Sequence, residues 1–165
     1  MAFALMAIFA IGCTDGIIDD PEKPDPDDIS GQWKSTATMA PAFADSIKAL
    51  TFTFFDLDNS FTLLKEYKNG QTATEDGQYT VGQKATNEEI YALTLTKNST
   101  KLYEGIFELN FDVTPNEATI SIVPATNGVE APYPDGGFSS GTWGFDGVQV
   151  YKKKKKKNFL IAIIR

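Results

Sequence analysis

The chain has 165 residues, which is room for one domain with a substantial core, and its many aromatic and threonine residues favour strands over helices. It contains no histidine and one cysteine, which excludes Ser-His-Asp and Cys-His catalysis, thiolate metal clusters and internal disulfides, so we predict neither an enzyme nor a cofactor or metal site. Residues 1–151 carry eight lysines against twenty-two Asp and Glu, a net charge of −14, and so acidic a body repels nucleic acid.

The chain begins with an apolar run, MAFALMAIFAI, that contains no charged side chain. As a helix at 1.5 Å per residue it reaches roughly 18 Å, which is too short to cross a hydrocarbon core of about 30 Å. Its length suits the apolar region of a secretion signal, which spans about 7–15 residues. We therefore predict that residues 1–12 are a signal peptide.

The only cysteine, Cys13, follows this run directly, in the stretch Ala10-Ile11-Gly12-Cys13. The stretch resembles the lipobox of bacterial lipoproteins, in which small residues precede a cysteine that is diacylated and becomes the new N-terminus. The resemblance implies that Cys13 is the lipid attachment site. It also implies that the protein is held at the bacterial cell envelope, on the outer membrane or cell surface. The alternative interpretation is a buried, unreactive cysteine behind an apolar strand.

An acidic, proline-rich segment follows, and residues 14–30 hold seven acids, one lysine and three prolines. Such a segment has little to bury, and proline and charge repulsion keep it extended and solvated. With Cys13 it forms the predicted linker, residues 13–30, between the membrane and a folded domain. Two or three acyl chains, at about 0.8 kcal/mol per buried methylene, hold a protein firmly to a membrane.

From Gly31 onward, apolar and polar residues alternate with a period of two, interrupted at intervals by turn residues. This pattern is typical of an all-β sandwich or barrel, and only residues 40–50 show a weak helical period. Because most links between strands are short, sequential antiparallel pairing is the simplest topology. The eight predicted strands are 32–39, 50–57, 61–68, 76–82, 89–97, 104–113, 117–124 and 145–153.

The first predicted strand opens with Gly31-Gln32-Trp33, in the stretch GQWKST. Together with LTFTFFDLDNSFTL, EDGQYTV and GVQVYKKK further along, it resembles the Gly-x-Trp signature and strand rhythm of the lipocalin-like domains of small Bacteroidota-type lipoproteins. The resemblance covers residues 31–153 and implies an eight-stranded up-and-down antiparallel barrel in which Trp33 closes one end of the cavity. Classic lipocalins pack an arginine over this tryptophan, and Lys152 is the candidate for that place here.

An eight-stranded barrel has an interior just wide enough for packed side chains or one small ligand. The resemblance implies a cavity that binds a small hydrophobic molecule. The alternative is that the same residues simply fill the core. The residues that we expect to face inward are Trp33, Phe52, Phe54, Tyr79, Leu93, Phe107, Leu109 and Phe111.

A long loop rich in glycine, proline and aromatic residues precedes the last predicted strand. Its segment 132–147 supports a competing hypothesis, a surface adhesion module or one that recognises carbohydrate or protein through an aromatic platform. The alternative is a lid over the barrel mouth, with the aromatic side chains buried. The platform residues are Tyr133, Phe138, Trp143 and Phe145.

The chain ends in KKKKKKNFLIAIIR, which differs from everything before it. Six lysines and a short apolar run suit a basic patch at a membrane surface, although the apolar run is far too short to span a bilayer. The alternative is a slipped reading frame within a run of A-rich lysine codons. In either case we expect residues 154–165 to lie outside the barrel.

Overall fold

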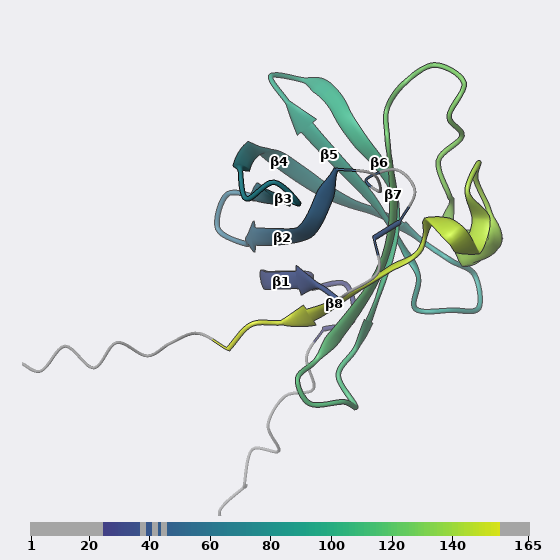
Figure 1. Ribbon diagram of the computed structural model, residues 1–165. Helices are drawn as coiled ribbons and strands as arrows, with labels where there is room; N and C mark the ends of the chain where they lie inside the picture. Colours follow the sequence, from purple (N-terminus) through teal and green to yellow (C-terminus); the bar gives the residue numbers. More distant parts are fainter. Residues whose placement is uncertain (1–24, 37–38, 41–42, 44–45, 156–165) are drawn as a thin grey trace, which may run out of the picture.

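The computed structural model describes residues 25–36, 39, 40, 43 and 46–155 (Figure 1). The predicted signal peptide, Cys13, most of the linker and the end of the tail lie outside these residues. Eight strands form one closed antiparallel barrel in which each strand pairs with its neighbours in sequence and β1 pairs with β8, which confirms the predicted all-β, up-and-down barrel. The strands are β1 (Gly31–Ser35), β2 (Ile47–Phe55), β3 (Ser60–Tyr67), β4 (Thr72–Lys84), β5 (Tyr91–Lys97), β6 (Thr100–Asn110), β7 (Glu117–Pro124) and β8 (Gln149–Lys153).

Several strand boundaries differ from the predicted ones. The weak helical period at residues 40–50 does not produce a helix at its end, because Ile47 to Leu50 already belong to β2. Strand β4 starts at Thr72, directly after the turn at Asn69-Gly70, because it pairs with the whole of β3. Strand β8 is shorter than predicted, because residues 144–147 form a 3₁₀ turn.

The core of the barrel is built from side chains that alternate along each strand and point inward. On β2 these are Leu50, Phe52 and Phe54, each at most 2% exposed. The ring of Phe52 stacks on Phe54 with centroids 5.5 Å apart, and it meets the ring of Tyr151 edge-on at 5.6 Å. Aromatic rings bury the largest apolar areas of any side chains, so these contacts dominate the stability of the barrel.

Both ends of the barrel are covered by chain segments next to β1. At one end the Trp33 side chain is completely buried, and its Nε1–H donates a 2.7 Å hydrogen bond to the carbonyl of Ile29. Ile29 itself is buried in the same core. Toward the other end, Phe43 packs against Tyr103 with ring centroids 5.8 Å apart.

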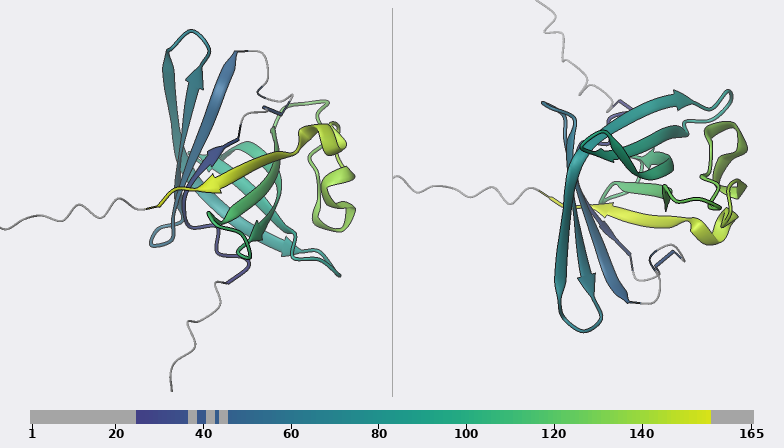
Figure 2. Two further views of the ribbon diagram at one scale, coloured as in Figure 1. Left: turned by 60° about the horizontal axis from the view of Figure 1, so that its bottom comes forward. Right: turned by 90° about the horizontal axis from the view of Figure 1, so that it is seen from above.

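The long loop before β8 lies against the outside of the barrel wall (Figures 1 and 2). It contains two short 3₁₀ segments, η2 (Pro134–Ser139) and η3 (Gly144–Gly147). Phe138 packs against a small apolar cluster of Ala85, Ile90 and Ile106. Ile106 alternates with the inward Phe107 and therefore faces outward. Ile106 is nevertheless fully buried. The loop thus covers part of the outer wall, whereas the lid interpretation placed it over the barrel mouth.

The described part of the chain contains little helix. Besides η2 and η3, only the single position Phe43 has a 3₁₀ conformation there. Among these residues, no helix has the length and apolar character needed to cross a membrane.

Candidate functional site

The eight predicted cavity residues all gather in the interior of the barrel. Seven of them are buried in one cluster, and the eighth, Phe111, is partly buried at the edge of the same cluster. Their rings contact one another and other inward rings, with centroids 5.0 Å apart for Phe54 and Tyr79 and 5.7 Å apart for Phe107 and Tyr91. These residues therefore pack as a core.

The inner wall also carries a polar network that the sequence analysis did not single out. Lys65 Nζ donates hydrogen bonds to Glu75 Oε1 at 2.7 Å and to Tyr103 Oη at 2.8 Å. Tyr103 Oη in turn donates to Glu75 Oε2 at 2.8 Å. Burial lowers the pKa of Lys65, but these hydrogen bonds outweigh it and raise the pKa above its usual value. The ammonium group therefore stays charged inside the wall of the barrel.

The hydroxyl of Tyr151 differs from this network, because it has no hydrogen-bond partner among the residues that the structure describes. The side chain is only 1% exposed, and burial raises the pKa of its hydroxyl well above the usual value. Tyr151 therefore stands apart from the network that joins Lys65, Glu75 and Tyr103.

We expect Tyr151→Phe to leave the free energy of unfolding at pH 7 within about 1 kcal/mol of the parent, because no hydrogen bond is lost. Above about pH 10 a tyrosine loses its proton more readily in the unfolded chain than in the fold, so stability falls as pH rises. The variant should consequently unfold at a higher alkaline pH. Near-UV circular dichroism during an alkaline titration measures this midpoint.

The matched control for that titration is Tyr133→Phe, which changes a tyrosine that is 54% exposed. It should leave the alkaline midpoint unchanged. A loss of several kcal/mol in Tyr151→Phe at pH 7 would instead show that the hydroxyl makes a bond that stabilises the fold.

Three of the four predicted platform residues lie on the surface. Tyr133 is 54% exposed, Trp143 38% and Phe145 74%, whereas Phe138 turns toward the barrel and packs against the outer wall. Large apolar side chains that remain exposed together on one segment are typical of interaction surfaces. The loop is therefore split between one residue that fixes it and three that face the solvent.

Hydrogen bonds hold the loop in this conformation. Thr142 pairs with Glu130 across the loop, through a backbone bond of 2.9 Å and a bond of 2.7 Å to the Thr142 hydroxyl. Asp135 Oδ1 accepts bonds from the backbone and the hydroxyl of Thr86, at 2.8 and 2.9 Å. These bonds lower the pKa of Asp135. The exposed aromatic rings therefore stand on a loop that is tied to itself and to the barrel.

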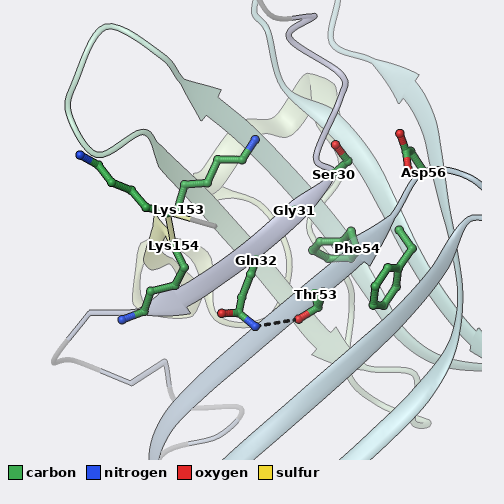
Figure 3. A pocket seen from close by; sticks show the side chains of 10 residues that line it. Ser30, Gly31, Gln32, Thr53, Phe54, Asp56, Lys153 and Lys154 are labelled. Carbon is green, nitrogen blue, oxygen red and sulfur yellow. Dashed lines mark hydrogen bonds between the residues drawn. The ribbon is translucent and has the colours of Figure 1, made fainter. Parts of the chain in front are cut away.

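A second surface feature is a pocket of about 740 Å³ at the edge of the barrel, which we call the lysine pocket (Figure 3). Three segments line it: residues 30–32 at the start of β1, residues 53–56 at the end of β2 and residues 153–155 at the end of β8. Figure 3 shows Lys153 and Lys154 on one side and Phe54 and Asp56 on the other. The closure of β1 against β8 brings these segments together.

Lys153 occupies the place that the resemblance assigned to Lys152. Its Nζ lies 5.0 Å from the ring centroid of Trp33, within the range of a cation–π contact. Gly31 leaves room for it, since a Cβ at that position would lie 2.9 Å from Lys153 Cε. Lys152 lies on the opposite face of the strand and pairs with Glu117 at 3.3 Å. The expected partner of Trp33 was therefore wrong by one residue, which in a strand exchanges the two faces.

Among the described residues, the structure thus offers a packed interior with a polar network, an aromatic loop on the outer wall and a lysine pocket at the barrel edge. The interior contains the predicted cavity residues and the loop contains the predicted platform residues, whereas Cys13 lies outside the described residues. Alternation alone indicated neither the polar network nor the lysine pocket, although Phe54 lines that pocket. Comparisons of the chain with protein-family models, with curated proteins and with solved structures found no match.

Proposed function

We propose that the chain is a lipid-anchored protein of the bacterial cell envelope whose lipocalin-like barrel displays the aromatic loop as a recognition surface for carbohydrate. The anchor rests on the lipobox-like stretch that ends at Cys13 and on the acidic linker after it. The observation that carries the recognition surface is the exposure of Tyr133, Trp143 and Phe145 on a loop that Phe138 fixes to the barrel.

The chemistry of the loop suits a sugar ligand. Aromatic rings offer flat apolar faces against which the C–H faces of a sugar ring can pack, and tyrosine and tryptophan add a polar edge. Asp135 and Asp146 on the same loop supply carboxylate oxygens that accept hydrogen bonds from hydroxyl groups. Because hydrogen bonds already order the loop, binding loses less conformational entropy than it would on a mobile segment.

A glycan array followed by titration calorimetry tests this surface. We expect a carbohydrate ligand whose affinity falls at least about tenfold in Trp143→Ala, since aromatic anchors dominate such contacts. The matched control is Leu57→Ala, which removes a side chain that is 97% exposed on the β2–β3 turn and should leave the affinity unchanged. An array without binding, or equal losses in both variants, would contradict the proposal.

The anchor is tested separately, by labelling cells with palmitate. The label should appear on the native protein and be absent from Cys13→Ser. A label that persists in the variant, or that never appears on the native protein, would contradict the anchor and leave the sugar proposal intact.

A second candidate function is the binding of a small molecule inside the barrel. It is favoured by the buried hydroxyl of Tyr151, which has no hydrogen-bond partner within the described part of the chain, and by the charged Lys65 that faces inward. Native mass spectrometry of protein purified from its own host would reveal a retained molecule. If the measured mass equals that of the protein alone, the barrel is filled by its own side chains and serves as a scaffold for the loop.

A further inference from the structure

One edge of the barrel holds both the place where the chain enters β1 and the place where it leaves β8. The backbone N–H of Lys154 donates a 2.8 Å hydrogen bond to the carbonyl of Gln32, and Ser30 and Lys155 line the same pocket. The chain therefore enters and leaves the barrel side by side. Between Cys13 and the first described residue lie only eleven residues, which reach at most about 40 Å when fully extended. An anchor at Cys13 would keep this edge close to the membrane.

Apolar side chains project from the turn at this edge. The turn between β2 and β3, residues 56–59, carries Leu57, which is 97% exposed, and it follows Phe55, which is 47% exposed. Phe55 and the next residue, Asp56, border the lysine pocket. An isolated exposed leucine is ordinary in a soluble protein, but apolar residues beside a cluster of lysines are typical of segments that enter the interfacial region of a bilayer.

The lysines at this edge have no ion-pair partner among the described residues. Six other lysines form salt bridges there, and they are Lys34, Lys65, Lys84, Lys97, Lys101 and Lys152. Lys153, Lys154 and Lys155 form none, although Asp56 lines the same pocket. No salt bridge within the described residues therefore neutralises these three charges, although Lys154 is close enough to Glu66 to help lower the pKa of that carboxyl. Each lysine close to an anionic lipid surface raises the membrane-binding constant by roughly a factor of five.

We propose that this edge docks on an anionic lipid membrane, with Leu57 and Phe55 entering the interface and Lys154 and Lys155 contacting the lipid phosphates. The lysine pocket is large enough to receive a headgroup between the lysines and Phe55. The proposal uses the anchor at Cys13 only to bring this edge to the membrane and is independent of the sugar ligand. The aromatic loop precedes β8 and the lysines follow it, so docking would turn the loop away from the bilayer (Figures 1 and 2).

The direct test follows a fluorescent probe at the tip of the turn. The test uses the full chain with two substitutions. Cys13→Ser removes the lipidation site, and Leu57→Cys introduces a single cysteine that carries an environment-sensitive fluorescent label. The control is Gln71→Cys on the turn between β3 and β4, at the other end of β3. With phosphatidylglycerol vesicles we expect the emission of the label to shift to the blue at position 57 and to stay unchanged at position 71. With phosphatidylcholine vesicles the emission at both positions should stay as it is in water.

A pair of charge variants tests the lysines. Lys154→Gln with Lys155→Gln should weaken vesicle binding on the order of 20-fold. The matched control is Lys48→Gln with Lys68→Gln, since neither lysine forms a salt bridge within the described residues and both lie at the end of the β2–β3 pair opposite the 56–59 turn. Lys48 and Lys154 both help to lower the pKa of Glu66, so each pair of substitutions removes one such interaction. This control should change binding less than about twofold. Lys153 is left unchanged because its contact with Trp33 belongs to the core.

Three results would overturn the proposal. Vesicle binding without a shift at position 57 would assign the binding to another part of the chain. Equal losses in the two lysine pairs would show a general charge effect. Binding of inorganic phosphate without binding of vesicles would make the pocket a site for a soluble anion. None of these results bears on the glycan array or on palmitate labelling, so the two proposals can fail separately.

Discussion

Replacing Trp33 with alanine is expected to lower the free energy of unfolding by about 3–5 kcal/mol, the usual loss when a fully buried tryptophan is removed. Trp33 is on β1, which lies between β2 and β8, and its indole is completely buried in the core and donates a hydrogen bond from Nε1–H to the carbonyl of Ile29. The variant also leaves Lys153 without the ring beneath its ammonium group. Urea unfolding followed by far-UV circular dichroism measures the loss.

The second tryptophan provides the control for this experiment. Trp143 is 38% exposed on the loop, so Trp143→Ala should change the free energy of unfolding by no more than about 1 kcal/mol. Each variant retains one tryptophan, and fluorescence then reports separately on the core and on the loop. Similar losses in both variants would contradict the assignment of Trp33 as the residue that closes the barrel end.

Gly105→Ala is expected to cost about 3 kcal/mol or more, at the upper end of what overpacking causes. A Cβ on Gly105 would lie 2.0 Å from the carbonyl oxygen of Ser121 and 2.8 Å from the Cα of Ile122, both on the backbone of β7. Strand β7 cannot move aside as a side chain would, so its pairing with β6 must break locally. The same urea titration measures the effect.

A glycine with a more tolerant neighbour serves as the comparison. In Gly82→Ala the new methyl group would meet the Cβ of Ala92 at 3.2 Å, a side-chain contact that a small shift relieves. We expect a change within about 1 kcal/mol. If Gly105→Ala were equally mild, the close approach of β6 and β7 at this position would be wrong.

Alternation in the sequence was sufficient to locate the strands and most of the core. It predicted residues 117–124 as a strand, and β7 has these bounds. It also placed Phe52 and Phe54 on one face, and both point into the barrel. Side chains of a strand alternate by local geometry, so this information is present in every short stretch of the chain.

The polar network could not be recognised in the same way. Lys65, Glu75 and Tyr103 lie on three strands, and a lysine or glutamate in an alternating strand is normally on the solvent side. Their contact depends on the register between β3 and β4 and on the curvature that brings β6 opposite. The one available signal was that Lys65 continues the inward series of Phe61 and Leu63.

For the loop before β8, too, the sequence indicated the kind of residues present but not which of them are exposed. Its composition indicated an aromatic surface or a lid, and the structure separates Phe138, which is held against the outer wall, from three aromatic residues that remain exposed. Nothing in the local sequence distinguishes these four residues. The apolar cluster of Ala85, Ile90 and the outward-facing Ile106, from distant parts of the chain, is the surface against which Phe138 packs.

The alternating pattern of the sequence was enough to predict that this protein is built of strands and which side chains those strands bury, and an acidic, proline-rich segment behind an apolar run that ends at Cys13 precedes them. The resemblance to lipocalin-like domains also predicted that the sheet closes into a barrel. Only the folded structure showed the register of that closure, which places residues 30–32 against 153–155 and sets Lys153 over Trp33. The reason is that alternation is a local property, encoded residue by residue. Closure and register depend on pairing between segments more than a hundred residues apart, which no short stretch records.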